Sequence, residues 1–131
     1  MFFTIDPANG LAIYDQIVRQ VKFAIADEAL PPGTFVPSVR ELATSLAVNP
    51  NTVARAYREL QSEGILATVR GTGLEVAPQA PKTCRQERVK LVRERIRAVL
   101  LEARQSQLDP AEIRELVEKE LTRLEAKGTP A

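Results

Sequence analysis

Side chains that could contact a nucleic acid are concentrated in one stretch of the chain, residues 50–58. Asn51, Thr52, Arg55 and Arg58 offer an amide, a hydroxyl and two guanidiniums within eight positions. Amides and guanidiniums pair with base edges in the major groove of DNA, and guanidiniums and hydroxyls also bind phosphates. If one helix carries these four residues, its outward face has the donors and acceptors needed to bind double-stranded DNA.

The elements that must position them are two short helices joined by a tight turn between residues 38 and 60. Ser38 and Glu41 have the spacing of a capping box, which starts the first helix. Asn49 and Pro50 are an N-cap and a first-turn proline, which start the second. A single stripe at helical spacing predicts the buried face of the second helix: Val53, Ala56, Tyr57 and Leu60. The pattern is typical of a helix-turn-helix, and an ordinary helical hairpin with a solvated face is the alternative.

A β-hairpin is predicted directly behind these helices, after Gly64. Two short runs, 65–69 and 74–76, alternate in polarity and flank a glycine-rich turn. We expect Ile65, Ala67 and Val69 to share one buried face with Leu74 and Val76. A hairpin in this place is the wing of a winged helix, and its glycines would let the tip approach a phosphate backbone. A plain hairpin turn is the alternative.

These patterns predict which residues bind DNA. Asn51 and Arg55 are expected to contact bases, while Arg40, Thr52 and the wing tip contact phosphates. The complete predicted set is Ser38, Arg40, Asn49, Asn51, Thr52, Arg55, Arg58, Arg70, Gly71, Thr72 and Gly73.

The rest of the chain is predicted to be mostly helical. Residues 2–5 should form a short strand or extended arm, and a helix over 12–29 should end at the Leu30–Gly33 turn. Prolines 78 and 81 predict a linker over 79–84, which divides a DNA-binding domain (1–78) from a two-helix region (85–127). Residues 128–131 should fray. The expected fold is mainly α with a small β hairpin, a winged helix-turn-helix followed by a two-helix dimerisation tail.

The two tail helices carry apolar faces that a helical hairpin cannot bury by itself. Pairing with a second copy of the chain would cover them, and folding back on the winged helix is the alternative. The residues expected at the dimer seam are Val92, Ile96, Val99, Leu100, Ile113, Leu116, Val117, Leu121 and Leu124. Many basic residues between 82 and 97 predict a solvated helix face, with phosphate contact as the alternative.

Composition limits the remaining function classes. The 131 residues include no histidine and only one cysteine, Cys84, so we expect no metal site, no cofactor and no enzyme activity. No run is long and apolar enough for a signal peptide or a membrane span, which predicts a cytoplasmic protein. Residues 1–80 carry 6 basic and 8 acidic side chains, 6 − 8 = −2, so bulk charge alone does not predict DNA binding.

Several motifs in this sequence resemble the GntR-type bacterial transcription regulators over residues 11–78. The motifs are Ile13-Tyr14-x-Gln16-Ile17, Pro32-Gly33-Thr34-x-x-Pro37-Ser38-x-Arg40-Glu41-Leu42-Ala43, Val48-Asn49-Pro50-Asn51-Thr52-Val53-x-x-Ala56-Tyr57-x-Glu59-Leu60 and Glu63-Gly64. The Asn-Pro-Asn-Thr-Val motif and the short helical tail are similar to the YtrA subfamily. The resemblance implies a dimeric cytoplasmic repressor, often of its own operon with transporter genes. It also implies DNA contacts at Arg40, Asn49, Asn51, Thr52 and the wing glycines.

The sequence departs from that family at several positions. Pro50 and Ala54 stand where many members have arginine, and Arg55 could supply the replacement. Ala47 replaces the usual turn glycine. Leu74 and Glu75 replace a common threonine–aromatic pair after the wing.

Two functions therefore follow from the sequence. The first is a homodimeric repressor that binds an inverted-repeat operator in double-stranded DNA. The second is a winged-helix protein-interaction module without sequence-specific DNA binding, which the −2 balance of residues 1–80 favours. The sequence does not identify a small-molecule effector.

Overall fold

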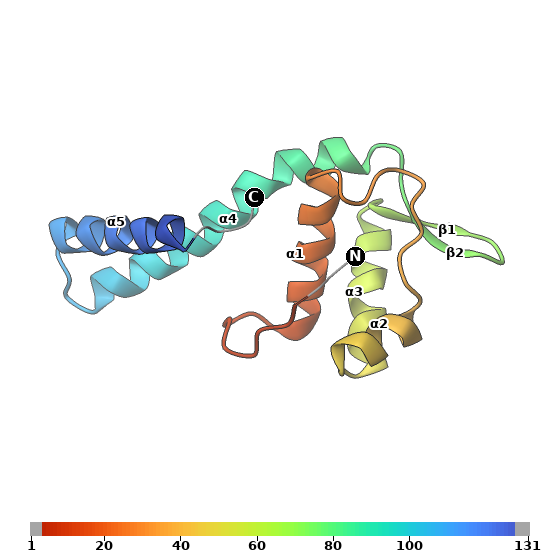
Figure 1. Cartoon of the computed structure of the whole chain (residues 1–131), viewed down its shortest axis with the longest axis horizontal. Coiled ribbons are helices and arrows are strands. Elements are labelled where there is room, and N and C mark those ends of the chain that lie inside the picture. Colours follow the sequence, from red (N-terminus) through yellow and green to blue (C-terminus); the bar gives the residue numbers. More distant parts are fainter. Residues whose placement is uncertain (1–3, 128–131) are drawn as a thin grey trace. The chain divides into compact units, whose positions relative to one another are not determined.

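The computed structural model describes residues 4–127 and is mainly helical, with one antiparallel β-hairpin (Figure 1). The elements follow the chain as α1 (Ile13–Ala26), α2 (Val39–Leu46), α3 (Pro50–Ser62), β1 (Leu66–Val69), β2 (Gly73–Val76), α4 (Ala80–Gln105) and α5 (Pro110–Ala126). The expected frayed end at 128–131 lies outside the described residues, as do residues 2 and 3 of the strand or arm expected at 2–5. Thr4 and Ile5 are not in a strand.

The predicted helix-turn-helix is confirmed, including its start signals. The Ser38 hydroxyl accepts a hydrogen bond from the Glu41 backbone N–H (3.1 Å), and the Glu41 carboxylate accepts one from the Ser38 N–H (3.0 Å). The Ser38 backbone N–H, and after it the Ser38 hydroxyl, stabilise the charged carboxylate and hold the pKa of Glu41 below its usual value. Ala47, in the turn, has left-handed φ/ψ values of 55° and 45°, so alanine occupies a conformation that glycine adopts more readily.

The hairpin is confirmed as well, but its predicted buried face was wrong in β1. Leu66 lies opposite Val76, and both side chains are buried. Residues opposite each other in an antiparallel pair share a face, so Ala67 and Val69 belong to the other face. Ile65 is buried too. It precedes the strand and follows the turn at Gly64, so it does not take part in the alternation.

The prediction of a linker over 79–84 was wrong, because α4 already begins at Ala80. Pro81 lies in the first turn of this helix, where the missing N–H has no partner in any case. Ala80 and Cys84 are one turn apart and are 0% and 1% exposed, so this turn packs into the core of the winged helix. Burial raises the pKa of the Cys84 thiol to about 11, with the negative charge of Glu87 adding to the shift.

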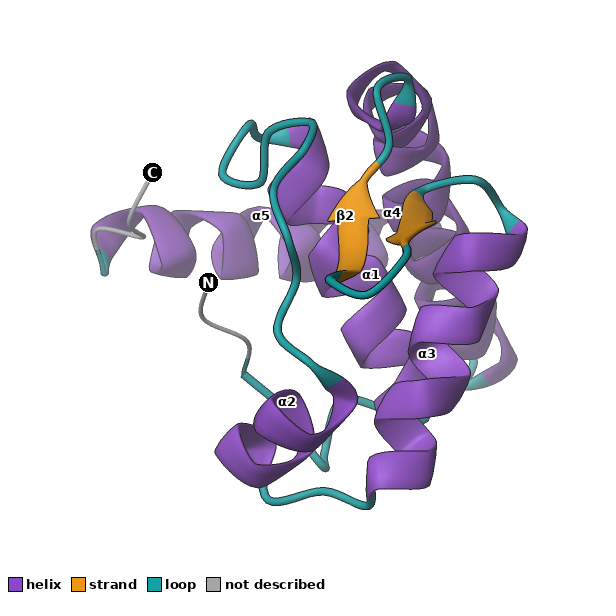
Figure 2. Ribbon diagram, turned by 90° about the vertical axis from the view of Figure 1, so that its right-hand side faces the viewer, coloured by secondary structure: helices purple, strands orange, loops and turns teal. Residues whose placement is uncertain are grey.

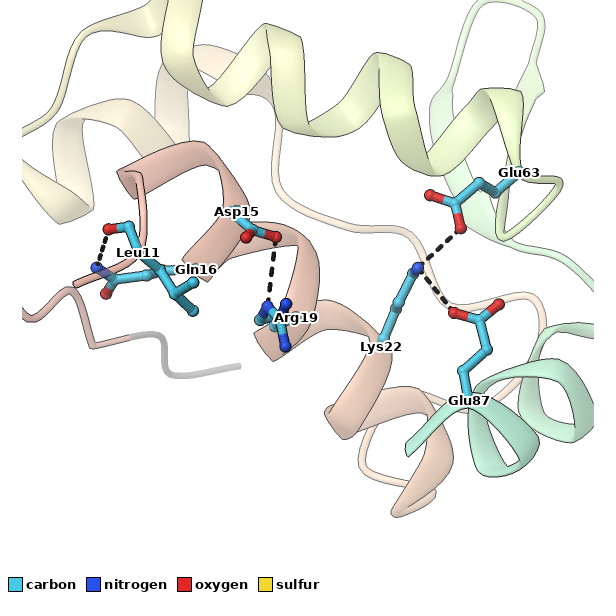
Figure 3. A network of polar contacts seen from close by, with 7 residues as sticks. All are labelled: Leu11, Asp15, Gln16, Arg19, Lys22, Glu63 and Glu87. Atoms are coloured by element: carbon cyan, nitrogen blue, oxygen red, sulfur yellow. Dashed lines mark hydrogen bonds and ion pairs between the residues drawn. The ribbon is translucent and has the colours of Figure 1, made fainter. Parts of the chain in front are cut away.

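A buried lysine joins three helices at this point (Figure 3). The Lys22 ammonium on α1 donates to Glu63 after α3 (2.8 Å) and to Glu87 on α4 (2.9 Å), and its side chain is only 6% exposed. Burial alone would lower the pKa of Lys22, but the hydrogen bonds and charges of both glutamates outweigh it, so the pKa is raised. The ion pairs therefore hold the first turns of α4 to the helices of the winged helix.

Helix α1 ends three residues earlier than expected. Glu28 has a φ of 64°, and the Ala29 N–H bonds back to the carbonyl of Ala24 (2.9 Å), which closes the helix with a left-handed C-terminal turn. Leu30 then returns into the core, where it is 5% exposed.

The chain divides into two compact units, with the boundary between Val89 and Lys90 inside α4. The first contains the whole buried core, whose largest fully buried side chains are Ile17, Ile25, Leu60, Ile65, Val21, Val53, Val76 and Cys84. In the second, no residue between 90 and 127 is buried. None of the helices in the described part of the chain has the length and apolar character needed to span a bilayer.

Candidate nucleic-acid interface

Helix α3 has one buried face and one polar face, as its sequence predicts. The four apolar residues of the predicted stripe are at most 2% exposed: Val53, Ala56, Tyr57 and Leu60. The Tyr57 hydroxyl donates to the Pro37 carbonyl (2.8 Å), and burial raises the pKa of Tyr57, so it stays a neutral donor. This bond ties α3 to the residue before the α2 cap. The structure thus fixes α3 against α2 and leaves its polar face outward.

The predicted contact residues of α3 lie on that outward face. Asn51, Arg55 and Arg58 are exposed, and Thr52 is half-buried. Their spacing of four and three residues places Asn51, Arg55 and Arg58 along one side of the helix. The Asn51 amide and the two guanidiniums are therefore exposed on the same side of α3, one after another along the helix.

Two predicted contact residues already cap a helix. The Asn49 side-chain carbonyl accepts from the Asn51 N–H (2.8 Å), and the Ser38 hydroxyl accepts from the Glu41 N–H. The Asn49 amide NH₂ remains as a donor at the N-terminus of α3, where anions are favoured. The Ser38 hydroxyl is directed at the Glu41 carboxylate, whose pKa it helps to lower.

The wing is a three-residue loop between paired strands. Arg70, Gly71 and Thr72 are exposed at the tip, and the Thr72 N–H bonds to the Val69 carbonyl (3.0 Å). Gly71 has a φ of +78°, and a Cβ there would meet nothing within 4 Å. The left-handed turn therefore favours glycine at this position, although there is room for a Cβ.

The segment before α2 is hydrogen-bonded to strand β2 of the wing. Val36 N–H bonds to the Leu74 carbonyl (3.0 Å), and Val76 N–H bonds to the Thr34 carbonyl (2.9 Å). Residues 34–36 therefore run along β2 as a short third partner of the hairpin. Figure 2 shows this segment beside the hairpin, with α2 next to the N-terminal end of α3.

Charge is distributed unevenly within the first 80 residues. Residues 39–72 carry 4 arginines and 3 glutamates, 4 − 3 = +1, whereas residues 1–38 carry 2 basic and 4 acidic side chains, 2 − 4 = −2. Two of those three glutamates are engaged elsewhere, Glu41 in the α2 cap and Glu63 with Lys22. Within residues 4–127 none of the four arginines is in an ion pair: Arg40, Arg55, Arg58 and Arg70. The net −2 thus lies in residues 1–38; α2, α3 and the wing tip carry the four arginines, and Glu75 on β2 makes residues 39–76 neutral, 4 − 4 = 0.

Sequence reasoning missed one partner of the candidate site, Tyr14 on α1. The Arg55 guanidinium carbon lies 3.7 Å from the centre of the Tyr14 ring. The Tyr14 side chain is half-buried against the core. A contact between residues so far apart in the chain leaves no local signal in the sequence.

The apolar residues predicted for the dimer seam lie on α4 and α5. Leu100 and Ile113 are half-buried. The others are between 45% and 61% exposed: Val92, Ile96, Val99, Leu116, Val117, Leu121 and Leu124. Metal-binding clusters of histidine, cysteine and carboxylate side chains do not occur among the described residues.

Known proteins share both the sequence and this arrangement. The family model for bacterial regulatory proteins of the gntR family matches residues 13–76. The HTH-type transcriptional repressor YtrA of Bacillus subtilis (strain 168) is 35% identical over 115 residues, which is 88% of each chain.

Solved structures agree with that comparison. A GntR family transcriptional regulator from Listeria monocytogenes matches with a TM-score of 0.63 and 32% identity, over 88% of this chain and 98% of that one. The DNA-binding domain of AraR, in complex with operator ORX1, matches with a TM-score of 0.50 and 27% identity, over 59% of this chain and 93% of that one. The protein is thus a helix-turn-helix transcription regulator of the GntR family, in its YtrA branch.

Proposed function

We propose that the protein is a homodimeric repressor that binds an inverted-repeat operator, with α3 of each copy in a major groove. The observation that carries this proposal is the polar face of α3. Asn51, Arg55 and Arg58 face outward in a row, on a helix whose opposite face is almost completely buried. A rigid helix with amide and guanidinium groups along one side matches the donor and acceptor pattern of base edges.

In this proposal the surrounding residues position α3 on the duplex. Arg40 on α2, Thr52 on α3 and the wing tip at 70–73 bind phosphates, while Asn49 adds an amide donor and Ser38 caps the helix that carries Arg40. Asn51 and Arg55 contact bases. The local excess of arginine over residues 39–72 supports this division, because phosphate contacts supply affinity and base contacts supply specificity.

The second copy is proposed from the exposed apolar side chains of α4 and α5. Seven large apolar residues on these two helices are about half exposed, and exposed apolar patches of this kind mark protein–protein interaction sites. A two-fold dimer would also give two α3 helices, which requires two half-sites in opposite orientation. The repressor role, a cytoplasmic location and control of a transporter operon are parts of the proposal taken from the resemblance to YtrA.

Selection of bound sequences from random duplex DNA tests the proposal most directly. We expect an enriched inverted repeat and an affinity that falls steeply as salt increases. In Arg55→Ala, preference at one base position of each half-site should relax, with a loss of about 1–3 kcal/mol. Enrichment of no sequence, together with binding that ignores salt, would instead support the protein-interaction module. Enrichment of a single unrepeated site would reject the dimer alone.

A further inference from the structure

The contact between Tyr14 and Arg55 joins two helices that meet beside the polar face of α3. Arg55 is exposed, but its guanidinium stacks on the Tyr14 ring at 3.7 Å. The ring is itself half-buried against the core. One face of the Arg55 guanidinium therefore contacts an aromatic ring that packs against the core.

This geometry leaves the useful part of arginine free. The five N–H donors of a guanidinium lie in its plane and point from its edge, whereas stacking occupies only a face. An arginine held flat on a ring can therefore still form a bidentate contact with guanine O6 and N7. Stacking also reduces the number of rotamers that binding must exclude, which lowers the entropic cost of that contact.

We infer that Tyr14, on a helix outside the helix-turn-helix, is a positioning residue for DNA specificity that orients Arg55 for base contact. The inference rests on the proposed function, since Arg55 must contact DNA for its orientation to matter. It assigns to the first helix a role in sequence preference beyond its place in the core. Tyr14 itself need not touch the duplex.

Four variants of the full chain separate orientation from packing: Tyr14→Leu, Tyr14→Phe, Arg55→Ala and the double variant Tyr14→Leu/Arg55→Ala. Each is titrated against the selected operator and against operators with single base changes. Tyr14→Leu keeps an apolar side chain for the core but removes the ring. Tyr14→Phe keeps the ring and is the matched control.

We expect Arg55→Ala to lose about 5- to 150-fold in affinity for the operator. Tyr14→Leu should lose about two- to fivefold, which is the range of an exposed cation–π contact. That loss should appear at the same base position as the loss in Arg55→Ala, and it should vanish when Arg55 is already alanine. Tyr14→Phe should keep the wild-type base preference.

The outcomes distinguish this inference from the proposed function. Suppose that wild type selects an operator, that Arg55→Ala loses base preference at one position and that Tyr14→Leu keeps it. The inference is then wrong and the proposed function stands. A Tyr14→Leu loss that persists in the double variant shows a purely structural role and also overturns it. A gain of base preference in Tyr14→Leu would show that the ring holds Arg55 away from DNA, which contradicts the inference as well. If wild type selects no sequence, the proposed function itself fails.

Discussion

Helices α3 and α5 begin with the same local signals but end in different surroundings. Each has an N-cap followed by proline at the first helical position, Asn49-Pro50 in α3 and Asp109-Pro110 in α5. The apolar stripe of α3 is at most 2% exposed, whereas Val117 and Leu121 of α5 are 46% and 49% exposed. Local sequence thus determines that a helix forms, and a tertiary partner determines whether its apolar face is buried. For α5 we propose that the partner is a second copy of the chain.

The largest effect is expected when residues 90–131, which carry α5 and most of α4, are removed. A chain that ends at Val89 keeps the whole core and the Lys22 ion pairs, so it should fold as a monomer. Its affinity for a full operator should fall by about 10²–10⁴, because the second half-site is no longer linked to the first. Sedimentation equilibrium and titration of full and half operators measure both effects. A dimer that survives the truncation would contradict the proposal.

The position of the cut provides a second check on the truncated chain. A chain that ends at Pro78 also lacks Ala80, Cys84 and Glu87, which pack on or pair with the first unit. It should therefore melt at a lower temperature than the chain that ends at Val89. Equal melting temperatures would show that the first turns of α4 add nothing to the core.

A single charge in the apolar face of α5 should reproduce the truncation. Val117→Asp should abolish self-association, because a carboxylate enclosed in an apolar seam loses its hydration. Thr122→Asp is the matched control, since it adds the same charge to an exposed position on another side of the same helix. Size-exclusion chromatography with light scattering should show a monomer for the first and a dimer for the second. If both variants are dimers, or both are monomers, the proposal that the apolar face of α5 forms the dimer interface is wrong.

The first unit offers a smaller and pH-dependent effect at Lys22. Lys22→Met should lower the free energy of unfolding by about 1–3 kcal/mol near neutral pH, since Glu63 and Glu87 lose their partner. The folded pKa of Lys22 is raised above its ordinary value of 10.5. Its contribution is therefore complete below pH 10.5 and is lost as pH rises through the folded pKa.

Urea unfolding at pH 8 and above pH 10.5 measures this effect. The difference in stability between wild type and Lys22→Met should shrink at the higher pH. Lys82→Met, at an exposed lysine of α4, is the control and should cost little at either pH. A difference that stays constant across this range would mean that the lysine charge is not what joins the helices.

The smallest effect is expected at Arg40. It tests whether α2 contacts phosphates while α3 contacts bases. Arg40→Ala should weaken binding by about 1 kcal/mol on every sequence and reduce the salt slope by about 1, because α2 is proposed to face phosphates. Selection from random DNA should return the wild-type operator. A changed operator would show that Arg40 contacts a base.

The parts of the fold that depend on nearby residues were predictable from the sequence. The Ser38–Glu41 box and the Asn49–Pro50 start each involve only a few neighbouring positions. The predicted linker failed because prolines also occur in the first turn of a helix, and only the burial of Ala80 and Cys84 separates the two cases.

Features that depend on pairing were not predictable in this way. The buried face of β1 depends on its register with β2, which places Leu66 rather than Ala67 against the core. The stacking of Arg55 on Tyr14 requires α1 and α3 to meet, and neither residue type signals the other. In the candidate site, the sequence identified side chains on the polar face of α3 but not the residue that supports one of them.

The segment before α1 is held in an unusual way. The Gln20 amide accepts from the Thr4 N–H (3.0 Å) and donates to the Thr4 carbonyl (2.6 Å), and the Gln16 amide makes the same pair of bonds to Asp6 (3.0 and 2.9 Å). The Gln16 and Gln20 amides, one helical turn apart, thus each bond to the N–H and the carbonyl of one residue of the segment. The backbone of a neighbouring strand would form similar pairs of bonds. Because every one of these bonds goes to the main chain, the path of the segment is encoded in α1. A substitution at Thr4 would keep these bonds, whereas Ile5 also packs against the core and the Asp6 carboxylate also accepts from the Ala8 N–H.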